Sequence, residues 1–179
     1  MRNVPPTLVF TFHTPLPHRR ETAQQLLRQQ LSTLLSPILH HPNIQLQSAP
    51  GEKPQLAPPF SAIGISISHA PGRTLLAINP HGPVGIDIIH LDPNINWQQL
   101  APHYFSPQTI EHILSQPASE RSAHFHQAWT RLEATLKCHG MPLCEWHPAI
   151  EPLYQQTQHT HLSLPNNWIG CLTWGNRNR

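Results

Sequence analysis

The sequence predicts an α+β fold built from two similar halves that meet near residue 80. Segments in which apolar and polar residues alternate, the pattern of half-buried strands, occur on both sides of this boundary. Each half also contains a longer segment with apolar residues at helical spacing. The element order therefore favours two halves, residues 1–80 and residues 81–179, with a shared architecture. The amino-acid sequences of the two halves show no visible repeat.

The first half is predicted to contain one long helix and four strands. Alternating residues predict strands at residues 7–12, 44–47, 62–68 and 75–78. Leucines at helical spacing predict a helix from residue 19 to about residue 36, which Pro37 is expected to end. The prolines between residues 48 and 60 predict a loop there.

The second half is predicted to contain two helices between two strands. Alternation predicts the strands at residues 84–89 and 168–174. Ser106 is expected to cap the first helix, with Pro107 in its first turn. Ser119 is expected to cap a longer second helix, and Gly140 is a suitable residue to end it.

The composition is that of a soluble globular protein without a marked affinity for nucleic acid. A length of 179 residues suffices for a hydrophobic core. The net charge of +2, with 11% charged residues, is too weak to indicate nucleic-acid binding. No apolar run reaches the roughly 20 residues that cross a bilayer. The first residues do not resemble a secretory signal, so we expect a cytoplasmic protein.

The cysteines do not form a recognisable disulfide framework, and we expect reduced thiols at Cys138, Cys144 and Cys171. Cys138 and His139, followed by Cys144 and His147, could in principle gather a zinc ion. Structural zinc sites usually have tighter ligand spacing. We therefore interpret these histidines as surface residues, with the zinc site as the alternative.

One acidic residue, Asp87, interrupts the apolar strand segment at residues 84–89. Burying an unpaired carboxylate is costly, so a metal ion, a cation or several hydrogen-bond donors should lie near it. From the residues alone, a functional aspartate and a structural one at a strand end remain equally open.

The long helix of the second half carries Trp129, Glu133 and Lys137 at a spacing of four. This spacing predicts that the three side chains share one face of the helix. The alternative to a functional role is an ordinary surface Glu-Lys pair, worth a few tenths of a kcal/mol, with the tryptophan packed beside it.

A third candidate lies where the strand at residues 62–68 ends. Ser68 and His69 precede a glycine-containing turn, and their hydroxyl and imidazole groups could contact phosphate oxygens. A plain turn is the alternative. The pair does not indicate a catalytic nucleophile, because Ser-His pairs of that kind are assembled in space rather than from adjacent residues.

Taken in order, five motifs between about residues 51 and 140 resemble those of the 4'-phosphopantetheinyl transferase superfamily. Gly51-Glu52-Lys53-Pro54 is similar to its Gly-Lys-Pro loop with one residue inserted, Ser68-His69 to its Ser-His motif, Val84-Gly85-Ile86-Asp87 to its metal-binding strand, Phe105-Ser106 to its Phe-Ser helix start, and Trp129 to Lys137 to its Trp-x-x-Lys-Glu-Ala-x-x-Lys helix. Each motif alone is common, but five in this order are hard to obtain by chance.

The resemblance implies the fold of that superfamily, with two similar α/β halves related by a pseudo-two-fold axis. It also implies transfer of 4'-phosphopantetheine from coenzyme A to a serine of an apo acyl or peptidyl carrier protein. Magnesium would be bound by Asp87 and Glu133. Glu133 or a metal-bound water would accept the serine proton. Two halves in one chain favour a monomer.

Further residues receive roles from the same resemblance. Lys137 would stabilise the developing charge or the leaving phosphate, and His69 would hold a pyrophosphate oxygen. Lys53 and Pro54 would lie near the adenine, and Ser68 would contact a phosphate. In addition, the resemblance implies that Arg20 or Arg28 contacts the 3'-phosphate of coenzyme A.

Three positions depart from the surfactin-synthetase-activating branch of the superfamily. Ile89 stands in place of a second acid, Thr109 in place of a glutamate and Leu132 in place of a lysine. The small holo-acyl-carrier-protein synthases use one aspartate and one glutamate, so this resemblance implies that Asp87 and Glu133 suffice as ligands. Two alternatives remain: a degenerate member that binds coenzyme A or a carrier protein without catalysis, and a structural α+β protein.

Overall fold

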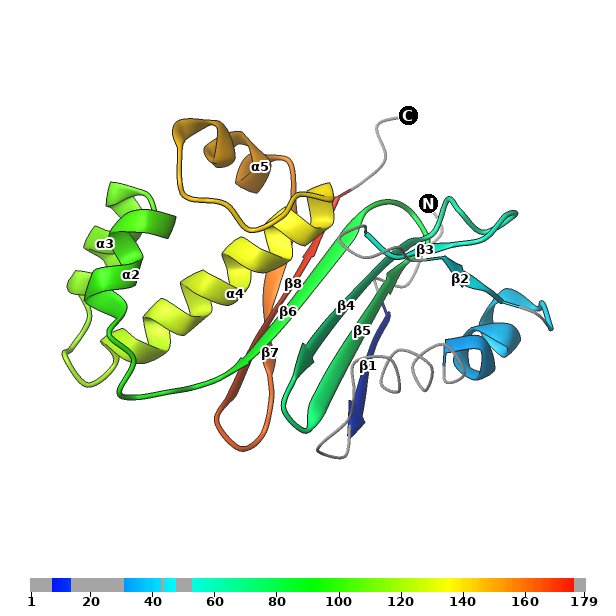
Figure 1. The fold of residues 1–179 in the computed structure, drawn as a ribbon, viewed down its shortest axis with the longest axis horizontal. Helices are drawn as coiled ribbons and strands as arrows, with labels where there is room; N and C mark the ends of the chain where they lie inside the picture. The colour runs from blue at the N-terminus through cyan, green and yellow to red at the C-terminus, as the bar shows by residue number, and fades with distance from the viewer. Residues whose placement is uncertain (1–7, 14–30, 43, 48–52, 176–179) are drawn as a thin grey trace, which may run out of the picture.

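Two three-stranded antiparallel sheets and one long helix form the centre of the fold (Figure 1). The computed structural model describes residues 8–13, 31–42, 44–47 and 53–175. The first sheet has the order β1-β5-β4, and its strands are β1 (Leu8–His13), β5 (Arg73–Asn79) and β4 (Gly64–Ala70). The second has the order β6-β8-β7, and its strands are β6 (Val84–His90), β8 (Trp168–Trp174) and β7 (Gln158–Ser163).

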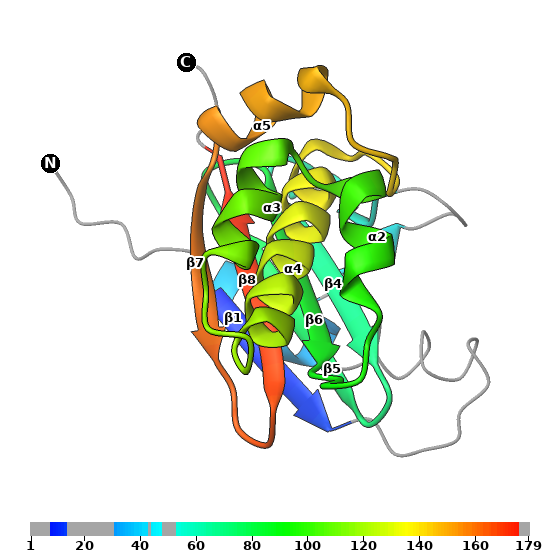
Figure 2. The same ribbon diagram turned by 90° about the vertical axis from the view of Figure 1, so that its left-hand side faces the viewer.

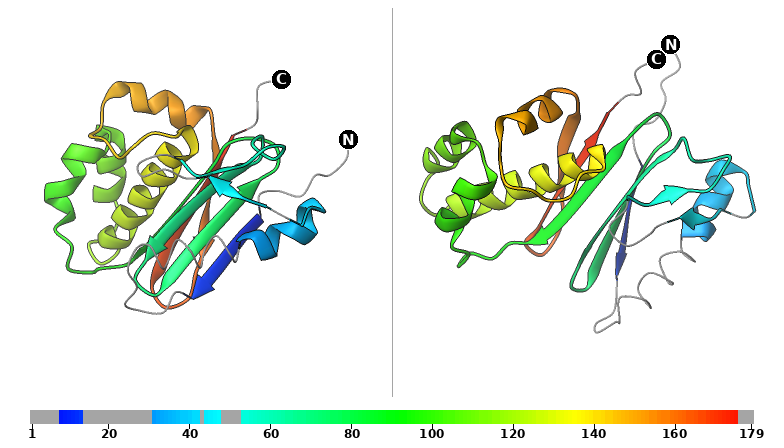
Figure 3. Two further views of the ribbon diagram at one scale, coloured as in Figure 1. Left: turned by 45° about the vertical axis from the view of Figure 1, so that its right-hand side comes forward. Right: turned by 45° about the horizontal axis from the view of Figure 1, so that its top comes forward.

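The long central helix is α4 (Arg121–His139), and the other elements lie around it and the two sheets. They are the two-stranded ribbon of β2 (Leu46–Gln47) and β3 (Gln55–Leu56), and the helices α2 (Trp97–Tyr104), α3 (Pro107–Leu114), η1 (Pro148–Ile150) and α5 (Glu151–Gln155). Further views show α4 against the β6-β8-β7 sheet, while the helical residues 31–39 lie beside the other sheet (Figure 3). None of the described helices is long and apolar enough to cross a membrane.

The two sheets meet along β4 and β6, and serine side chains join them there. The hydroxyl of Ser66 accepts a hydrogen bond from the amide of Ile86, and the hydroxyl of Ser68 accepts one from the amide of Ile88. Apolar residues of β5, β6 and β8 bury a shared core beside this seam. The seam therefore brings the Ser68 side chain of the first half of the chain onto the strand that carries Asp87.

Helix α4 packs directly on β6 because Gly85 has no side chain. A Cβ atom at this position would overlap the backbone carbonyl of Ala134 and the backbone amide of Cys138. The close approach places the carboxyl-terminal part of α4 next to the middle of β6. As a result, residues about fifty positions apart in the sequence can share one site.

The structure confirms an α+β fold, with several changes to the predicted elements. The helix predicted to end at Pro37 continues to residue 39. Buried Leu31 and Leu35, with Leu39 packed against the same core, stabilise this last turn although proline lacks an amide hydrogen. Ser119 is not the cap of α4, which begins after Glu120 without a side-chain cap. The capping of α3 by Ser106 is confirmed, since its hydroxyl accepts from the Thr109 amide at 3.2 Å.

The sequence did not predict α2, β7, η1 or α5, and β3 lies within residues 48–60, which were predicted to form a loop. Helix α2 contains Pro102 and several glutamines, which weaken its helical pattern, but Trp97 and Ala101 bury its inner face. Strand β7 is an exposed edge strand with one aliphatic residue, Leu162, so its sequence shows no apolar alternation. The two sheets fall on either side of residue 80, while the pseudo-two-fold relation and the division into halves stay predictions.

Candidate functional site

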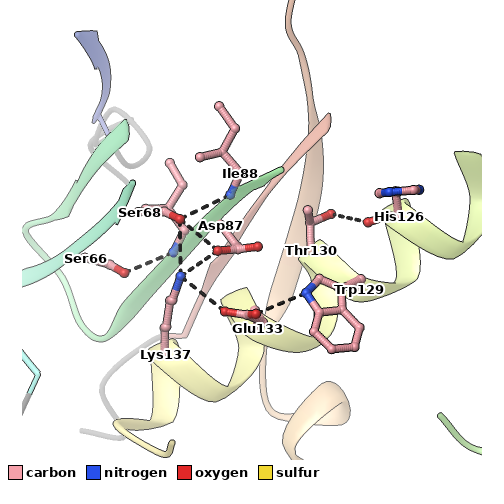
Figure 4. Close-up of polar contacts among 10 residues, drawn as sticks. Ser66, Ser68, Asp87, Ile88, His126, Trp129, Thr130, Glu133 and Lys137 are labelled. Carbon is pink, nitrogen blue, oxygen red and sulfur yellow. Dashed lines mark hydrogen bonds and ion pairs between the residues drawn. The ribbon is translucent and has the colours of Figure 1, made fainter. Parts of the chain in front are cut away.

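The centre of the candidate site is the carboxylate of Asp87, which lies in the middle of β6 and is buried, with 5% of the residue exposed. Its Oδ1 accepts a hydrogen bond from the Ser68 hydroxyl at 2.8 Å and lies 2.5 Å from Lys137 Nζ (Figure 4). Lys137 also donates to the Ser68 hydroxyl at 3.3 Å. A metal ion, a cation or several donors were predicted near this carboxylate, and the structure places a cation and a hydroxyl donor there, which offsets the cost of burying it.

A second carboxylate, that of Glu133, approaches the same lysine from α4. Its Oε2 lies 3.5 Å from Lys137 Nζ, and its Oε1 accepts a hydrogen bond from the Trp129 indole at 3.0 Å. The predicted shared helix face is thus confirmed. The ring of Trp129 packs in turn against Phe105, with 6.4 Å between ring centroids. The indole holds one oxygen of Glu133, so the other turns toward the Asp87 cluster (Figure 4).

The electrostatic balance at Asp87 is dominated by burial. Loss of hydration raises the pKa of the Asp87 carboxyl above its usual value, since it penalises the charged form. The Lys137 ammonium and the hydrogen bonds from Lys137 and Ser68 act in the opposite direction, and the nearby Glu133 carboxylate adds to the increase. A further positive charge near Asp87 would therefore stabilise the ionised form of its carboxyl group.

This shift predicts how stability depends on pH. An acid with a raised pKa binds its proton more readily in the folded state, so its contribution to stability is complete below the usual value of 3.8 and is lost as the pH rises through the raised pKa. We expect the free energy of unfolding of the wild type, minus that of Asp87→Asn, to fall across this range in urea titrations. A difference that grows with pH would mean that attraction to Lys137 outweighs burial.

A pocket of about 280 Å³ lies beside the acid cluster. Lys137 lines it together with Lys53 and Pro54 of the loop before β3. Lys53 Nζ donates to the carbonyl of Cys138 at 2.8 Å, near the end of α4, where a cation is favourable. Burial lowers the pKa of the Lys53 amine, while interaction with Cys138 acts in the opposite direction. The pocket therefore contains two lysines from distant segments.

Ser66 and Gly140 also line this pocket, and neither was predicted as a site residue. Ser66 precedes Ser68 by two positions, and residues two apart on a strand point to the same face. That spacing is a signal that could have identified it. The position of Gly140 depends on how α4 ends against the Lys53 segment, which the sequence does not reveal.

His69 lies next to Ser68 on β4, and its side chain therefore points to the other face of the strand. It is exposed, and its Nδ1 lies 2.8 Å from Thr74 Oγ1. The structure does not join His69 to the described contacts of Asp87, Glu133 and Lys137. The predicted residues Arg20 and Arg28, and Gly51 and Glu52 of the loop motif, lie outside the described residues.

A comparison with family models provides an independent finding about this region. Residues 83–169, which contain β6, α4 and the acid cluster, match the model of the 4'-phosphopantetheinyl transferase superfamily. Over these residues the chain is similar to that superfamily, which supports the resemblance found in the sequence. A search of curated proteins found no significant match.

The three departures from the transferase pattern have distinct positions in the structure. Ile89 is partly buried on β6, so this position offers no carboxylate to the acid cluster. Leu132 is fully buried in the core that α2, α3 and α4 share, away from the face that carries Glu133. Thr109 lies near the start of α3 and contacts Ser106, with 3.1 Å between the two hydroxyl oxygens. None of these replacements disturbs the contacts of Asp87, Glu133 and Lys137.

Among the described residues, no group of three or more His, Cys, Asp or Glu side chains gathers in a way that could hold a metal ion. A zinc site made by the Cys138 to His147 segment is therefore not present in this arrangement, where Cys138 is buried. Asp87 and Glu133 are the two acids that the structure brings together, each within 4.0 Å of Lys137 Nζ.

Proposed function

We propose that this protein transfers 4'-phosphopantetheine from coenzyme A to a serine of an apo acyl or peptidyl carrier protein, which yields the holo carrier and adenosine 3',5'-bisphosphate. The main support is that Asp87 and Glu133 converge on Lys137 beside a pocket that also contains Lys53. Paired acids suit a divalent cation, and paired lysines suit phosphate groups.

Magnesium is the metal that we propose for the two acids. The donor set fits, because two carboxylates share one ammonium group, and within the described residues Asp87 Oδ2 makes no hydrogen bond. Magnesium commonly binds through one or two carboxylates, with water and substrate phosphate as the other ligands. When bound, it would neutralise pyrophosphate charge and polarise the phosphorus that the serine attacks.

Glu133 is the residue we propose as the base. The serine oxygen forms a bond to the phosphorus that carries the pantetheine, the bond from that phosphorus to adenosine bisphosphate breaks, and Glu133 accepts the serine proton. Its side chain is 25% exposed, so a substrate can reach it. The indole of Trp129 fixes its orientation. Lys137 stabilises the negative charge on the leaving phosphate.

The other predicted residues are proposed to bind coenzyme A. Lys53 and Pro54 line the pocket and would lie near the adenine, while Ser68, beside Lys137, would contact a phosphate. His69 is exposed at the strand end and would hold a pyrophosphate oxygen from there. Arg20 or Arg28 is proposed for the 3'-phosphate on the basis of the family resemblance alone.

A carrier assay tests the proposed function directly. Purified protein, magnesium, coenzyme A and an apo carrier are expected to give a carrier heavier by one phosphopantetheine group, as measured by intact-protein mass spectrometry. Carriers of fatty acid, polyketide and nonribosomal peptide synthesis should be compared, because the site residues do not distinguish them. Reactions without magnesium or without coenzyme A serve as controls. Absence of a mass increase on all carriers would contradict the proposal.

One observation supports a second candidate function, a family member that binds coenzyme A without catalysis. Lys137 Nζ is 2.5 Å from Asp87 Oδ1, so the ammonium already supplies a cation to the acid that would bind magnesium. Calorimetry that shows coenzyme A binding independent of magnesium, with no product in the carrier assay, would favour this alternative. Binding that requires magnesium would favour the transferase.

A further inference from the structure

A second polar pocket lies on the opposite side of α4 from the acid cluster. It has a volume of about 380 Å³ and lies among α3, α4, α5 and β7. Figure 2 shows this side, with α3 between β7 and α4 and with α5 across their ends. Helix α4 contributes His124, Gln127 and Arg131 to it. At 3.6 residues per turn these positions lie roughly opposite Glu133.

Arg131 is the main charged group of this pocket, and its charge has no partner among the described residues. In the described parts of the chain, the Nε atom is buried without a hydrogen bond, and no carboxylate oxygen lies within 4.0 Å of the guanidinium group. Its Cζ lies 4.7 Å from the ring centroid of Tyr154, so the guanidinium lies over the ring. Stacking fixes the plane of the group, and a guanidinium can donate two parallel hydrogen bonds to a ligand with two oxygens.

The groups around Arg131 favour an anion. Thr109 and Gln127 supply a hydroxyl and an amide, and His124 and His161 supply imidazoles. Burial lowers the pKa of His161, and the charge of Arg131 lowers it further. The positive charge of Arg131 therefore acts on the imidazole of His161. Glu151 also lines the pocket, but it is exposed and makes no ion pair with Arg131 among the described residues.

Thr109 is one of the positions where this chain departs from the transferase pattern, which has a glutamate there. Thr109 and Arg131 line the same pocket. A glutamate at this position would extend a carboxylate into the pocket and could neutralise the guanidinium. The threonine in this chain leaves both the space and the positive charge available.

We propose that this pocket binds a small molecule with a phosphate monoester group, held by Arg131 and by the hydroxyl of Thr109. Arginine presents parallel N–H donors that match two phosphate oxygens. A volume of about 380 Å³ is within the range of small-molecule sites and exceeds the space that one phosphate requires. The site is separate from the acid cluster and does not depend on the proposed transferase activity.

Isothermal titration calorimetry with inorganic phosphate and with glycerol 3-phosphate tests the proposal on the full chain. Both are expected to bind, and the ester more tightly, because the pocket has room beyond the phosphate. Arg131→Met is expected to weaken binding of the ester at least about tenfold, which corresponds to about 1.4 kcal/mol. Failure of the ester to bind, or equal binding to Arg131→Met, would overturn the proposal.

Two further variants separate this site from the coenzyme A pocket and from effects on folding. Lys137→Met should bind the ester as tightly as the wild type, since Lys137 lines the other pocket. If Lys137→Met lost ester binding while Arg131→Met kept it, the ester would bind in the pocket of Lys53 and Lys137 instead, and the proposal would be wrong. Thr109→Glu should abolish binding because its carboxylate occupies the pocket, while circular dichroism and thermal melting show that it folds. Undiminished binding to folded Thr109→Glu would also contradict the proposal.

Discussion

Replacement of Asp87 by asparagine is expected to lower the rate of phosphopantetheine transfer about 100- to 1000-fold, because several kcal/mol of charge stabilisation depend on this proposed metal ligand. The change keeps the size of the side chain and removes its charge. Asp87 contacts both Ser68 and Lys137, so an amide also weakens the hold on the lysine. Initial rates with an apo carrier, measured over a range of magnesium concentrations, give the size of the effect.

Asp92→Asn is the matched control for this prediction. Asp92 is exposed and accepts a hydrogen bond from the Asn94 amide at 2.9 Å, a role that asparagine can also fill. The control should retain the wild-type rate. Glu133→Gln should lose activity as Asp87→Asn does, if both acids act on one metal ion. Full activity in Asp87→Asn or in Glu133→Gln, with an unchanged circular dichroism spectrum, would rule out the proposed magnesium site.

Gly85→Ala is expected to cause the largest loss of stability, about 3 kcal/mol or more, at the upper end of the range for an overpacked core. The added methyl group would overlap the backbone of α4 at Ala134 and Cys138. Backbone atoms cannot move aside as a flexible side chain can, so the helix must shift away from β6. The free energy of unfolding in urea, compared with that of the wild type, measures this loss.

Gly72→Ala provides a control with the same chemical change. Its φ is +80°, and a Cβ atom there would have no neighbour within 4 Å. The cost should therefore come from backbone strain alone, about 1–2 kcal/mol. Transfer activity should persist in Gly72→Ala and fall in Gly85→Ala, because only the second variant separates Lys137 and Glu133 from Asp87. Equal stability losses would show that the contact of α4 with β6 is not as restrictive as the structure indicates.

Much of the fold could be predicted from local patterns. The strand at residues 168–174 alternates over its full length and was predicted with the bounds it has in the structure. Ser106 was predicted as a cap because serine followed by proline is a local signal, and the cap is made within four residues. Helix α2 escaped prediction because its buried face is set by neighbouring elements, and strand β7 because it is an exposed edge strand without apolar alternation.

The candidate site also has features that could be predicted from the sequence and features that could not. The sequence by itself determined that Trp129, Glu133 and Lys137 share a helix face, because four residues make about one helical turn wherever the helix lies. It also identified Asp87 as a carboxylate that needed a partner, since charge among apolar neighbours is costly.

Only the tertiary structure decided which partner Asp87 has. The packing of α4 on Gly85 brings Lys137 to it, and the seam of β4 and β6 brings Ser68. The same packing left Arg131 on the far side of the helix, in a pocket of its own. Helical and strand periods depend on adjacent residues and can be read from the sequence. Distances between separate elements depend instead on how their surfaces fit together in three dimensions, which no local pattern specifies.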